Sequence, residues 1–468
     1  MLFNSIEFWI FLPVVWLLYF AIPHKFRWIW LLCASYFFYG FWKVEFAALM
    51  LGTTIVDWYC GLRVEDNGKN KYRFYWLWFS ILTNIGALFV FKYFNFFLGD
   101  TPIANDLYNN RWTAWAIELG KYTIPAGISF YTFQSLSYII DVYRGDEKPQ
   151  KNLPKFMLFV SFFPQLVAGP IERFGKLNHQ LFSKHTIQWK NISNGARILL
   201  YGLFLKVCVA DNLSLVVDDF YSNPTVYGSW GAWQGIIAFA FQVFADFFGY
   251  SLLAQGAALV FGIDLMDNFN KPYIAKSIPE FWHRWHISLS TWFRDYVFIP
   301  IGGNKRGPWI LAFAVMVVFA TSGLWHGANT TMIIFGVCQG LLYLFDRFIF
   351  SRIKITGMAW DGFRNFKTVM FFALSLVYFR SASMHQTDDV FGLLFSNTKG
   401  QENLNYPIYI PIFMLLFFLL DNYIINQRID KWLDKFTLPI RWTFYAFAIA
   451  CIWLLGGATN HPFVYFQF

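Results

Sequence analysis

The sequence predicts an all-α membrane protein that crosses the bilayer many times. Hydrophobic residues make up 57% of its 468 residues and charged residues only 14%. The chain also holds 58 Phe, 25 Tyr and 22 Trp, and its apolar runs approach the roughly 20 residues that a helix needs to cross a bilayer. We therefore expect one domain over residues 1–468, with about eleven membrane helices plus re-entrant and interfacial helices.

The net charge of +9 fits this class. Lys and Arg collect in the cytoplasmic loops of membrane proteins, whereas nucleic-acid binding would need a basic face on a soluble domain. The sequence leaves no room for such a domain, so we expect no nucleic-acid partner. The cysteines have neither metal nor disulfide spacing and are expected to be free, buried thiols. They are Cys33, Cys60, Cys208, Cys338 and Cys451.

The alternation of apolar runs and basic loops predicts the topology. Lys25 and Arg27 follow the first run closely, which puts the N-terminus outside. The same rule places the Lys305–Arg306 turn in the cytoplasm and the C-terminus outside, with polar outer loops at residues 99–120 and 381–405. Membrane segments are expected at residues 6–22, 28–60 (two segments, broken near Lys43), 75–98, 124–142, 195–217, 233–261, 310–325, 331–344, 369–379, 408–420 and 443–455.

Two segments differ from plain membrane spans. Residues 124–142 carry Ser, Gln and Tyr among apolar residues, which is typical of a helix that faces the protein interior or a wet path. Residues 156–170 are broken by Pro164 and Gly169 and have basic residues on both flanks. Broken backbone at membrane depth is tolerated only where protein buries it or where it lines a cavity. We expect this second segment to enter the membrane and return.

The most informative stretch covers residues 277–328, where His, Arg, Asp and Ser stand inside membrane-like sequence. Ionisable groups in such surroundings cost about 2.5–3.5 kcal/mol each on insertion scales, so they indicate function. Ser277 and Glu280 form a capping box that predicts a helix to about Tyr296, ending before Pro300. Its apolar face would carry Trp282, Trp285, Leu289, Trp292 and Tyr296, and its polar stripe His283, His286, Ser290 and Arg294. Such a helix is expected to lie in the interface or to line a cavity.

His326 ends a separate apolar run at residues 311–325, and three interpretations of it stay open. It bonds a backbone carbonyl, or acts as a general base on an acceptor hydroxyl, a role worth roughly 10²–10⁴-fold in rate, or binds a metal without local companion ligands.

Two other groups of polar residues also have alternative roles. Glu280, His283 and His286 provide metal-ligand types at E-x-x-H-x-x-H spacing but no closed shell, so we assign no metal. Arg294 and Asp295 either position a phosphate-bearing donor or form a structural ion pair with a neighbouring helix.

Four motifs resemble the membrane-bound O-acyltransferase (MBOAT) family, above all its bacterial branch of alginate O-acetyltransferases, peptidoglycan O-acetyltransferases and teichoic acid D-alanyl transferases. They are GPIERF at residues 169–174, NFNKPY at 268–273, FWHRWHISLSTWFRDYVFIPIGGN at 281–304 and GLWHGA at 323–328. The resemblance covers roughly the first three quarters of the chain, with the motifs concentrated in residues 120–345.

This resemblance implies that His326 is the family's essential membrane-embedded histidine and His286 its second characteristic one. It also implies an acyl thioester donor and a tunnel that joins the cytoplasmic donor to an outer acceptor. The sequence departs from the family at three positions. His283 stands where the closest relatives usually have Arg and inherits no catalytic role, while Phe248 and Leu252 replace a Ser and an Asp that are common in relatives.

Together, the residues and the resemblance predict an O-acetyltransferase of the bacterial cytoplasmic (inner) membrane. Acetyl-CoA, or another acyl thioester, would arrive from the cytoplasm as a substrate, with no bound cofactor. His326 would activate the acceptor hydroxyl and His286 would support the donor or the tunnel, with an acyl-histidine intermediate as the alternative. The residues expected to bind the donor or line the tunnel are Asn268, Ser288, Ser290, Arg294, Asp295 and Trp325.

The predicted acceptor is an extracytoplasmic polysaccharide, either an alginate-like exopolysaccharide or peptidoglycan. Because the outer loops show no G-D-S-type nucleophile motif, we expect a separate extracytoplasmic protein to accept the acyl group first. Two other classes compete with the enzyme. A transporter or flippase would use buried His, Asp and Arg as a path and would favour an inverted repeat, which is not evident here. A scaffold subunit of a polysaccharide export system would leave His326 dispensable.

Cysteine labelling tests the predicted topology. The variant Asn304→Cys, beside the basic Lys305–Arg306 turn, should not react with a membrane-impermeant thiol reagent in intact cells and should react once the membrane is opened. The control Asn397→Cys, in the outer loop at residues 381–405, should react in both cases. Ready labelling of Asn304→Cys in intact cells would refute the topology.

Overall fold

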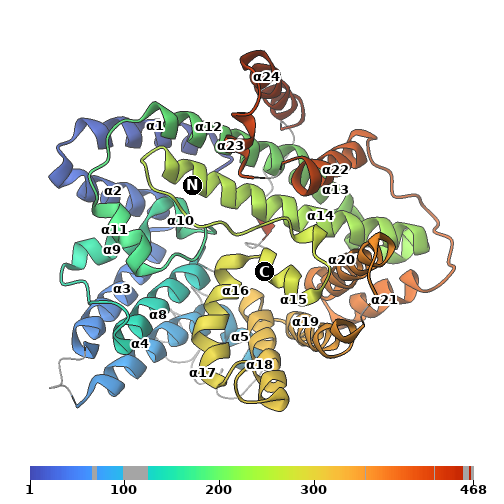
Figure 1. The fold of residues 1–468 in the computed structure, drawn as a ribbon, viewed down its shortest axis with the longest axis horizontal. Helices are drawn as coiled ribbons and strands as arrows, with labels where there is room; N and C mark the ends of the chain where they lie inside the picture. The colour runs from blue at the N-terminus through green and yellow to red at the C-terminus, as the bar shows by residue number, and fades with distance from the viewer. Residues whose placement is uncertain (66–70, 99–124, 354, 426, 457–462, 465–468) are drawn as a thin grey trace. The chain divides into compact units, whose positions relative to one another are not determined.

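The regular elements in the described part of the chain are helical. The computed structural model describes residues 1–65, 71–98, 125–353, 355–425, 427–456, 463 and 464, and Figure 1 shows its helices. Within these residues, extended pairing is confined to an isolated bridge between Gly228 and Lys399. The predicted all-α class is confirmed.

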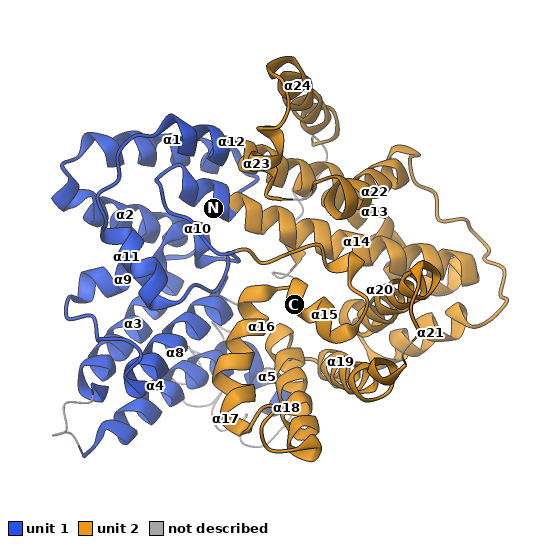
Figure 2. Cartoon of the chain, viewed as in Figure 1, with its two compact units in different colours: residues 1–196, 254–266 blue, residues 197–253, 267–468 orange. Residues whose placement is uncertain are grey.

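The described residues form two compact units, coloured separately in Figure 2. Unit 1 consists of residues 1–196 and 254–266, and unit 2 of residues 197–253 and 267–468. Helices α12 (Trp189–Phe204) and α14 (Pro224–Leu259) contribute residues to both units. The single domain expected over the whole chain stays a prediction.

Unit 1 contains the N-terminal helices, and its breaks lie where the sequence predicts them. Its elements are α1 (Ile6–Ala21), α2 (His24–Gly40), α3 (Val44–Val64), α4 (Arg73–Leu88), the π-helix η1 (Phe89–Tyr93), α5 (Phe94–Leu98), α8 (Ile128–Arg144), α9 (Leu153–Ser161), α10 (Phe163–Leu166) and α11 (Phe174–Phe182). The gap between α2 and α3 matches the break expected near Lys43. Phe162 has an extended ψ of 111° between α9 and α10, so the segment at residues 156–170 is broken as predicted. The loop expected at residues 99–120 lies outside the described residues.

Unit 2 contains the helices that carry the two predicted histidines. Its first elements are η2 (Leu205–Ala210), α13 (Asp211–Ser222), η3 (Pro272–Ile274), α15 (Ile278–Arg284), α16 (Ile287–Phe293), η4 (Arg294–Phe298), α17 (Ile299–Ile301), α18 (Pro308–His326), α19 (Thr330–Phe348) and η5 (Phe350–Arg352). The C-terminal part adds α20 (Met358–Arg380), α21 (Met384–Leu394), α22 (Tyr409–Leu419), η6 (Leu420–Ile424), α23 (Ile429–Leu433) and α24 (Leu438–Leu455).

The polar outer loop expected at residues 381–405 contains a helix, α21, that the sequence analysis does not predict, while its outer position stays a prediction. Ser383 Oγ accepts a hydrogen bond from the backbone N–H of Gln386 (3.2 Å), which satisfies an orphan donor and starts the helix.

Several helices are long and apolar enough to cross a membrane. In the described residues, six helical segments meet this criterion: Arg73–Tyr93, Trp189–Ser222, Pro224–Leu259, Pro308–His326, Thr330–Arg352 and Leu438–Leu455. Two further apolar helices, Ile6–Ala21 and Tyr409–Ile424, are shorter than this criterion requires. The chain is thus a multi-pass membrane protein, while the number eleven, the tunnel and the orientation of the termini stay predictions.

The single helix expected from Ser277 to about Tyr296 is a wrong prediction. Its start is correct, since Ser277 Oγ accepts from the N–H of Glu280 (3.2 Å) as a capping box requires. However, α15 ends at Arg284, and His286 adopts a left-handed conformation with φ 43° and ψ 54° before α16 begins. The helical path then continues through η4 and α17 beyond Pro300, which lies in the first turn of α17, where a missing N–H is tolerated.

Helices α18 and α19 pack closely because small residues stand at their contact. A Cβ atom built on Gly336 would lie 2.2 Å from the carbonyl oxygen of Phe319, and one built on Gly323 would lie 2.3 Å from that of Met332. Glycine at such positions lets two helix backbones approach each other within a membrane. Since α18 ends at His326, this contact fixes the histidine relative to α19.

The variant Gly336→Ala should therefore lower the free energy of unfolding by about 1–3 kcal/mol, because its methyl group meets backbone that cannot move aside. Thermal unfolding of the purified protein measures the effect. The matched control is Gly362→Ala in α20, where a Cβ atom meets nothing within 4 Å and alanine's helix propensity adds up to about 1 kcal/mol. A melting temperature of Gly336→Ala equal to that of the wild type would contradict the close packing.

Candidate functional site

The two predicted histidines lie near each other inside unit 2. His286 is fully buried and His326 is 6% exposed. Their ring centroids are 6.5 Å apart, with an angle of 51° between the ring planes. One ring comes from the break before α16 and the other from the C-terminal end of α18. Two segments that are distant in the sequence thus supply one pair of imidazoles.

Aromatic rings surround this histidine pair. Phe247 of α14 contacts His286 edge-on, with ring centroids 4.5 Å apart and an interplanar angle of 89°. The Trp325 ring lies 6.0 Å from His286 and 4.9 Å from His326. Phe379 of α20 lies 5.4 Å from His326. The two imidazoles therefore lie in a low-dielectric environment, in which polar interactions are strengthened.

Asn268 holds the backbone on which His286 stands. Its carbonyl oxygen accepts from the N–H of Ile287 (2.9 Å), and its side-chain Oδ1 accepts from the N–H of Ser288 (3.3 Å). Its Nδ2 donates to Ser251 Oγ on α14 (3.0 Å). Asn268 thereby satisfies N–H groups that the helix break leaves without intrahelical partners. Asn268 and Ser288, both assigned from the sequence to the donor or tunnel set, lie directly beside His286.

The charge state of His286 follows from its surroundings. Burial, and then the nearby His326, hold the pKa of His286 well below its ordinary range. The ring is therefore neutral at physiological pH, and a neutral imidazole has one nitrogen that donates a hydrogen bond and one that accepts.

Buried polar side chains of α19 anchor helix α15. The N–H of Ile278 donates to Asp346 Oδ2 (2.5 Å), and the other oxygen of Asp346 pairs with Lys367. The indole N–H of Trp282 donates to Gln339 Oε1 (3.1 Å). Because Asp346 and Gln339 belong to α19, the helix that leads to His286 is fixed to the helix that packs against α18.

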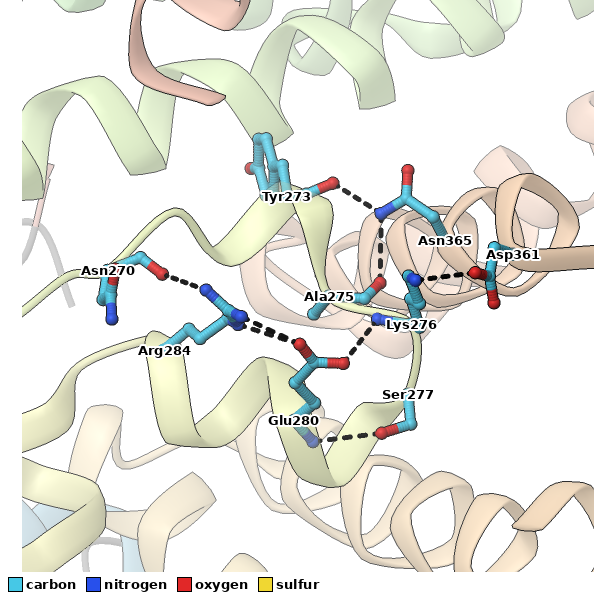
Figure 3. Close-up of polar contacts among 9 residues, drawn as sticks. All are labelled: Asn270, Tyr273, Ala275, Lys276, Ser277, Glu280, Arg284, Asp361 and Asn365. Carbon is cyan, nitrogen blue, oxygen red and sulfur yellow. Dashed lines mark hydrogen bonds and ion pairs between the residues drawn. The ribbon is translucent and has the colours of Figure 1, made fainter. Parts of the chain in front are cut away.

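The loop that leads into α15 is fixed from the other side by α20, as Figure 3 shows. The amide of Asn365 donates to the carbonyl oxygens of Tyr273 (2.7 Å) and Ala275 (3.0 Å). Lys276 Nζ pairs with Asp361 (2.8 Å). The NFNKPY motif thus forms a connected scaffold between Asn268 and the start of α15.

A cavity of about 230 Å³ lies beside α16 and α18. Ser290 and Arg294, two of the predicted donor residues, line it together with Asn304 and Arg347. Ser322 also lines it and stands one helical turn before His326 on α18. The cavity is therefore lined by two basic side chains, those of Arg294 and Arg347, and by a residue four positions before His326 in the chain.

Other predicted positions do not form the expected groups. Asp295 pairs with Arg294 (2.8 Å), its neighbour in the chain, and it does not belong to the cavity lining. The continuous polar stripe expected over His283, His286, Ser290 and Arg294 is a wrong prediction. The helix breaks at His286, and the ring of His286 is buried. His283 instead remains exposed and lines the cavity.

The possible metal ligands of this stretch are also dispersed. Glu280 binds Arg284 (3.0 Å) and accepts from the N–H of Lys276 (2.9 Å). His283 and His286 lie on opposite sides of the end of α15 in the chain, one exposed and one buried. Across the part of the chain that the structure describes, no group of three His, Cys, Asp or Glu side chains is placed to hold a metal ion.

Several residues of the site lie outside any motif, so the sequence alone does not single them out. Phe247 and Phe379 belong to apolar helices and look like any of the 58 phenylalanines. Asn304 and Arg347 of the cavity are different, because a polar residue at the end of an apolar segment is a usable signal. Asn304 also closes the long motif at residues 281–304, and its amide oxygen accepts from Arg347 (3.3 Å).

The GPIERF motif has a structural place in unit 1. Glu172 is 1% exposed, and its Oε1 accepts from the N–H of Met266 (2.6 Å). Burial raises the pKa of Glu172 to about 7. The motif therefore holds the chain directly before the NFNKPY segment.

Comparisons with known proteins agree with these motifs. Residues 149–385 match the model of the membrane-bound O-acyltransferase family. The chain is 39% identical over 403 residues to a probable alginate O-acetylase of Pseudomonas syringae pv. tomato, and this alignment covers 85% of this chain and 75% of the relative. It is 34% identical over 424 residues to a peptidoglycan O-acetyltransferase of Helicobacter pylori, with 82% and 78% covered. It is 31% identical over 229 residues to a teichoic acid D-alanyltransferase of Bacillus subtilis, with 46% and 57% covered.

The alginate O-acetylase and the peptidoglycan O-acetyltransferase align over most of both chains, and the family match includes both histidines together with the Asn268 scaffold. The resemblance deduced from the motifs is confirmed: this chain is an enzyme of the membrane-bound O-acyltransferase family.

Proposed function

We propose that this enzyme moves acetyl groups from cytoplasmic acetyl-CoA to a hydroxyl group, for the O-acetylation of an extracytoplasmic polysaccharide. The observation that carries the proposal is the buried pair of His286 and His326 within aromatic walls. The names of the relatives support an acetyl group and a cell-surface polymer such as an alginate-like exopolysaccharide or peptidoglycan.

In the proposed reaction His326 is the general base. Its ring nitrogen takes the proton of the acceptor hydroxyl while the oxygen attacks the thioester carbonyl carbon. The carbon–sulfur bond then breaks, the acetyl group stays on the acceptor oxygen, and the thiolate of CoA takes the proton back from His326. The surrounding rings of Trp325, Phe335 and Phe379 keep bulk water away, which limits hydrolysis of the thioester.

The second histidine has a supporting role in this proposal. A neutral His286 presents a donor and an acceptor at 6.5 Å from the base, measured between ring centroids. It orients the thioester or a bound hydroxyl rather than exchanging the reacting proton. Asn268 and Ser288 act through it by fixing the backbone conformation at the helix break.

The donor enters through the cavity beside α16. Arg294 and Arg347 are the charged residues that suit the phosphates of CoA, because a guanidinium forms paired hydrogen bonds with phosphate oxygens. Ser290 and Asn304 offer polar atoms to the amides of the pantetheine arm. The apolar cavity walls guide that arm towards Ser322 and hence towards His326.

The acceptor side includes a separate protein. In the predicted topology the outer surface is formed by the loops at residues 99–120 and 381–405, the second of which contains α21. A polymer that lies away from the membrane reaches a buried histidine poorly. An extracytoplasmic partner with a serine or similar nucleophile would accept the acetyl group at the outer mouth and pass it to the polysaccharide.

His326→Ala and His326→Gln should lower the rate of acetyl transfer by at least about 100-fold while leaving the folded yield nearly unchanged, because each removes the general base. The measurement is acetyl transfer from radiolabelled acetyl-CoA by purified protein. His385→Ala is the matched control, because that histidine is 88% exposed on α21 and pairs with Asp389. A His326 variant that keeps more than about a tenth of the wild-type rate contradicts this role and favours a transporter or scaffold.

Reconstituted liposomes test the relay to an outer protein. With acetyl-CoA inside and purified polymer outside, this chain alone should acetylate the polymer slowly, because the acceptor cannot approach the buried site. Addition of an extracytoplasmic fraction from the source cell should raise the rate. The same fraction added to liposomes that contain His326→Ala serves as the control. If the chain alone acetylates the polymer at a rate that no outer protein increases, transfer is direct.

A further inference from the structure

The C-terminal residues Phe463 and Val464 lie against the same helix that contacts His286. The Phe463 ring stacks on Tyr250 of α14, with centroids 4.6 Å apart and an interplanar angle of 27°, and lies 5.7 Å from the Phe247 ring. Phe463 is 1% exposed and Val464 4% exposed. The Phe247 ring thus contacts both Phe463 and His286.

A buried group of charges fixes the backbone of this C-terminal segment. Asp246 Oδ2 accepts from the N–H of Val464 (2.7 Å). The other oxygen of Asp246 pairs with Lys206 Nζ (2.7 Å), and the same Nζ pairs with Asp211 (2.7 Å). All three charged side chains are less than a tenth exposed.

Asp246 has two carboxylate oxygens, and each needs a partner in this buried position, which explains the role of Val464. An ionised carboxylate is tolerated in an apolar interior only when its oxygens receive hydrogen bonds or a cation. Lys206 serves one oxygen of Asp246, and the Val464 amide serves the other. Asp246 is also the neighbour of Phe247 in the chain, so the carboxylate that binds the Val464 amide and the ring that contacts His286 stand on the same turn of α14.

We propose that Phe463 and Val464 form a C-terminal clasp that positions His286 for acyl transfer. Phe463 confines the Phe247 ring, and Phe247 confines the imidazole of His286 through their edge-on contact. These residues do not touch the reacting atoms in this scheme and act as positioning residues. The proposal rests on the proposed function, because it takes His326 as the general base and His286 as the group that orients the reactants.

The variant Phe463→Ala tests the positioning role. It should lower kcat by about tenfold or more, since a small misplacement of a catalytic group is enough for such a loss. KM for acetyl-CoA should stay within about twofold, because other residues line the donor cavity. Phe463→Tyr should keep kcat near the wild-type value, because it retains the ring. The matched control is Trp453→Ala, which removes an aromatic side chain that is 81% exposed on α24, and it should leave kcat unchanged.

Hydrogen–deuterium exchange of the full-length protein tests the clasp without an activity assay. The Val464 amide should exchange at least about 100-fold more slowly than in an unfolded peptide, both in the wild type and in His326→Ala. Exchange at the unfolded rate overturns the clasp, as does a kcat of Phe463→Ala equal to that of the wild type. The positioning role is also overturned if Phe463→Tyr loses as much kcat as Phe463→Ala and KM for acetyl-CoA rises by an equal factor. If His326→Ala stays active, the proposed function fails, and the exchange result still decides whether the clasp exists.

Discussion

The geometry of the site depends on the hydrogen bonds that Asn268 makes across the break between α15 and α16. A helix that is interrupted in apolar surroundings leaves backbone N–H groups that water cannot satisfy. Asn268 serves those of Ile287 and Ser288 and is itself tied to Ser251 of α14. Without this connection His286 would have continued the helix, and its ring would have pointed with the polar stripe rather than towards His326.

Buried charged side chains link neighbouring segments of unit 2 to one another. Asp346 receives both Lys367 and the first N–H of α15, and Asp246 receives both Lys206 and the Val464 amide. Each carboxylate thus combines a cation with a backbone donor. Such pairs add little net stability when they replace well-packed apolar groups, but they become costly when one partner is removed. Their value here is specificity, because they select one arrangement of helices that are otherwise similarly apolar.

The sequence was sufficient for the class and for many of the apolar helices, and it singled out two histidines that the structure brings near each other. Long apolar runs indicate helices directly, and the break at Phe162 carries its own signal in Pro164. The break at His286 carries none, because Trp285 to Ser288 contains neither Gly nor Pro and the cause lies in Asn268, distant in the chain. The same holds for Phe247 and Phe379, whose importance comes from the fold alone. Helix α21 was missed although Ser383 and Gln386 form a readable capping pair.

The left-handed backbone at His286 affects how substitutions at this position are to be interpreted. A residue with a Cβ atom pays a conformational penalty there that glycine avoids and that asparagine and aspartate tolerate best among the others. Exchange for alanine removes the imidazole and keeps the strained backbone, whereas exchange for glycine removes the ring and relieves the strain. The difference between these two variants separates side-chain chemistry from folding at one residue. A β-branched residue such as valine combines both defects, so ordinary measures of chemical similarity rank the substitutions at this position in the wrong order.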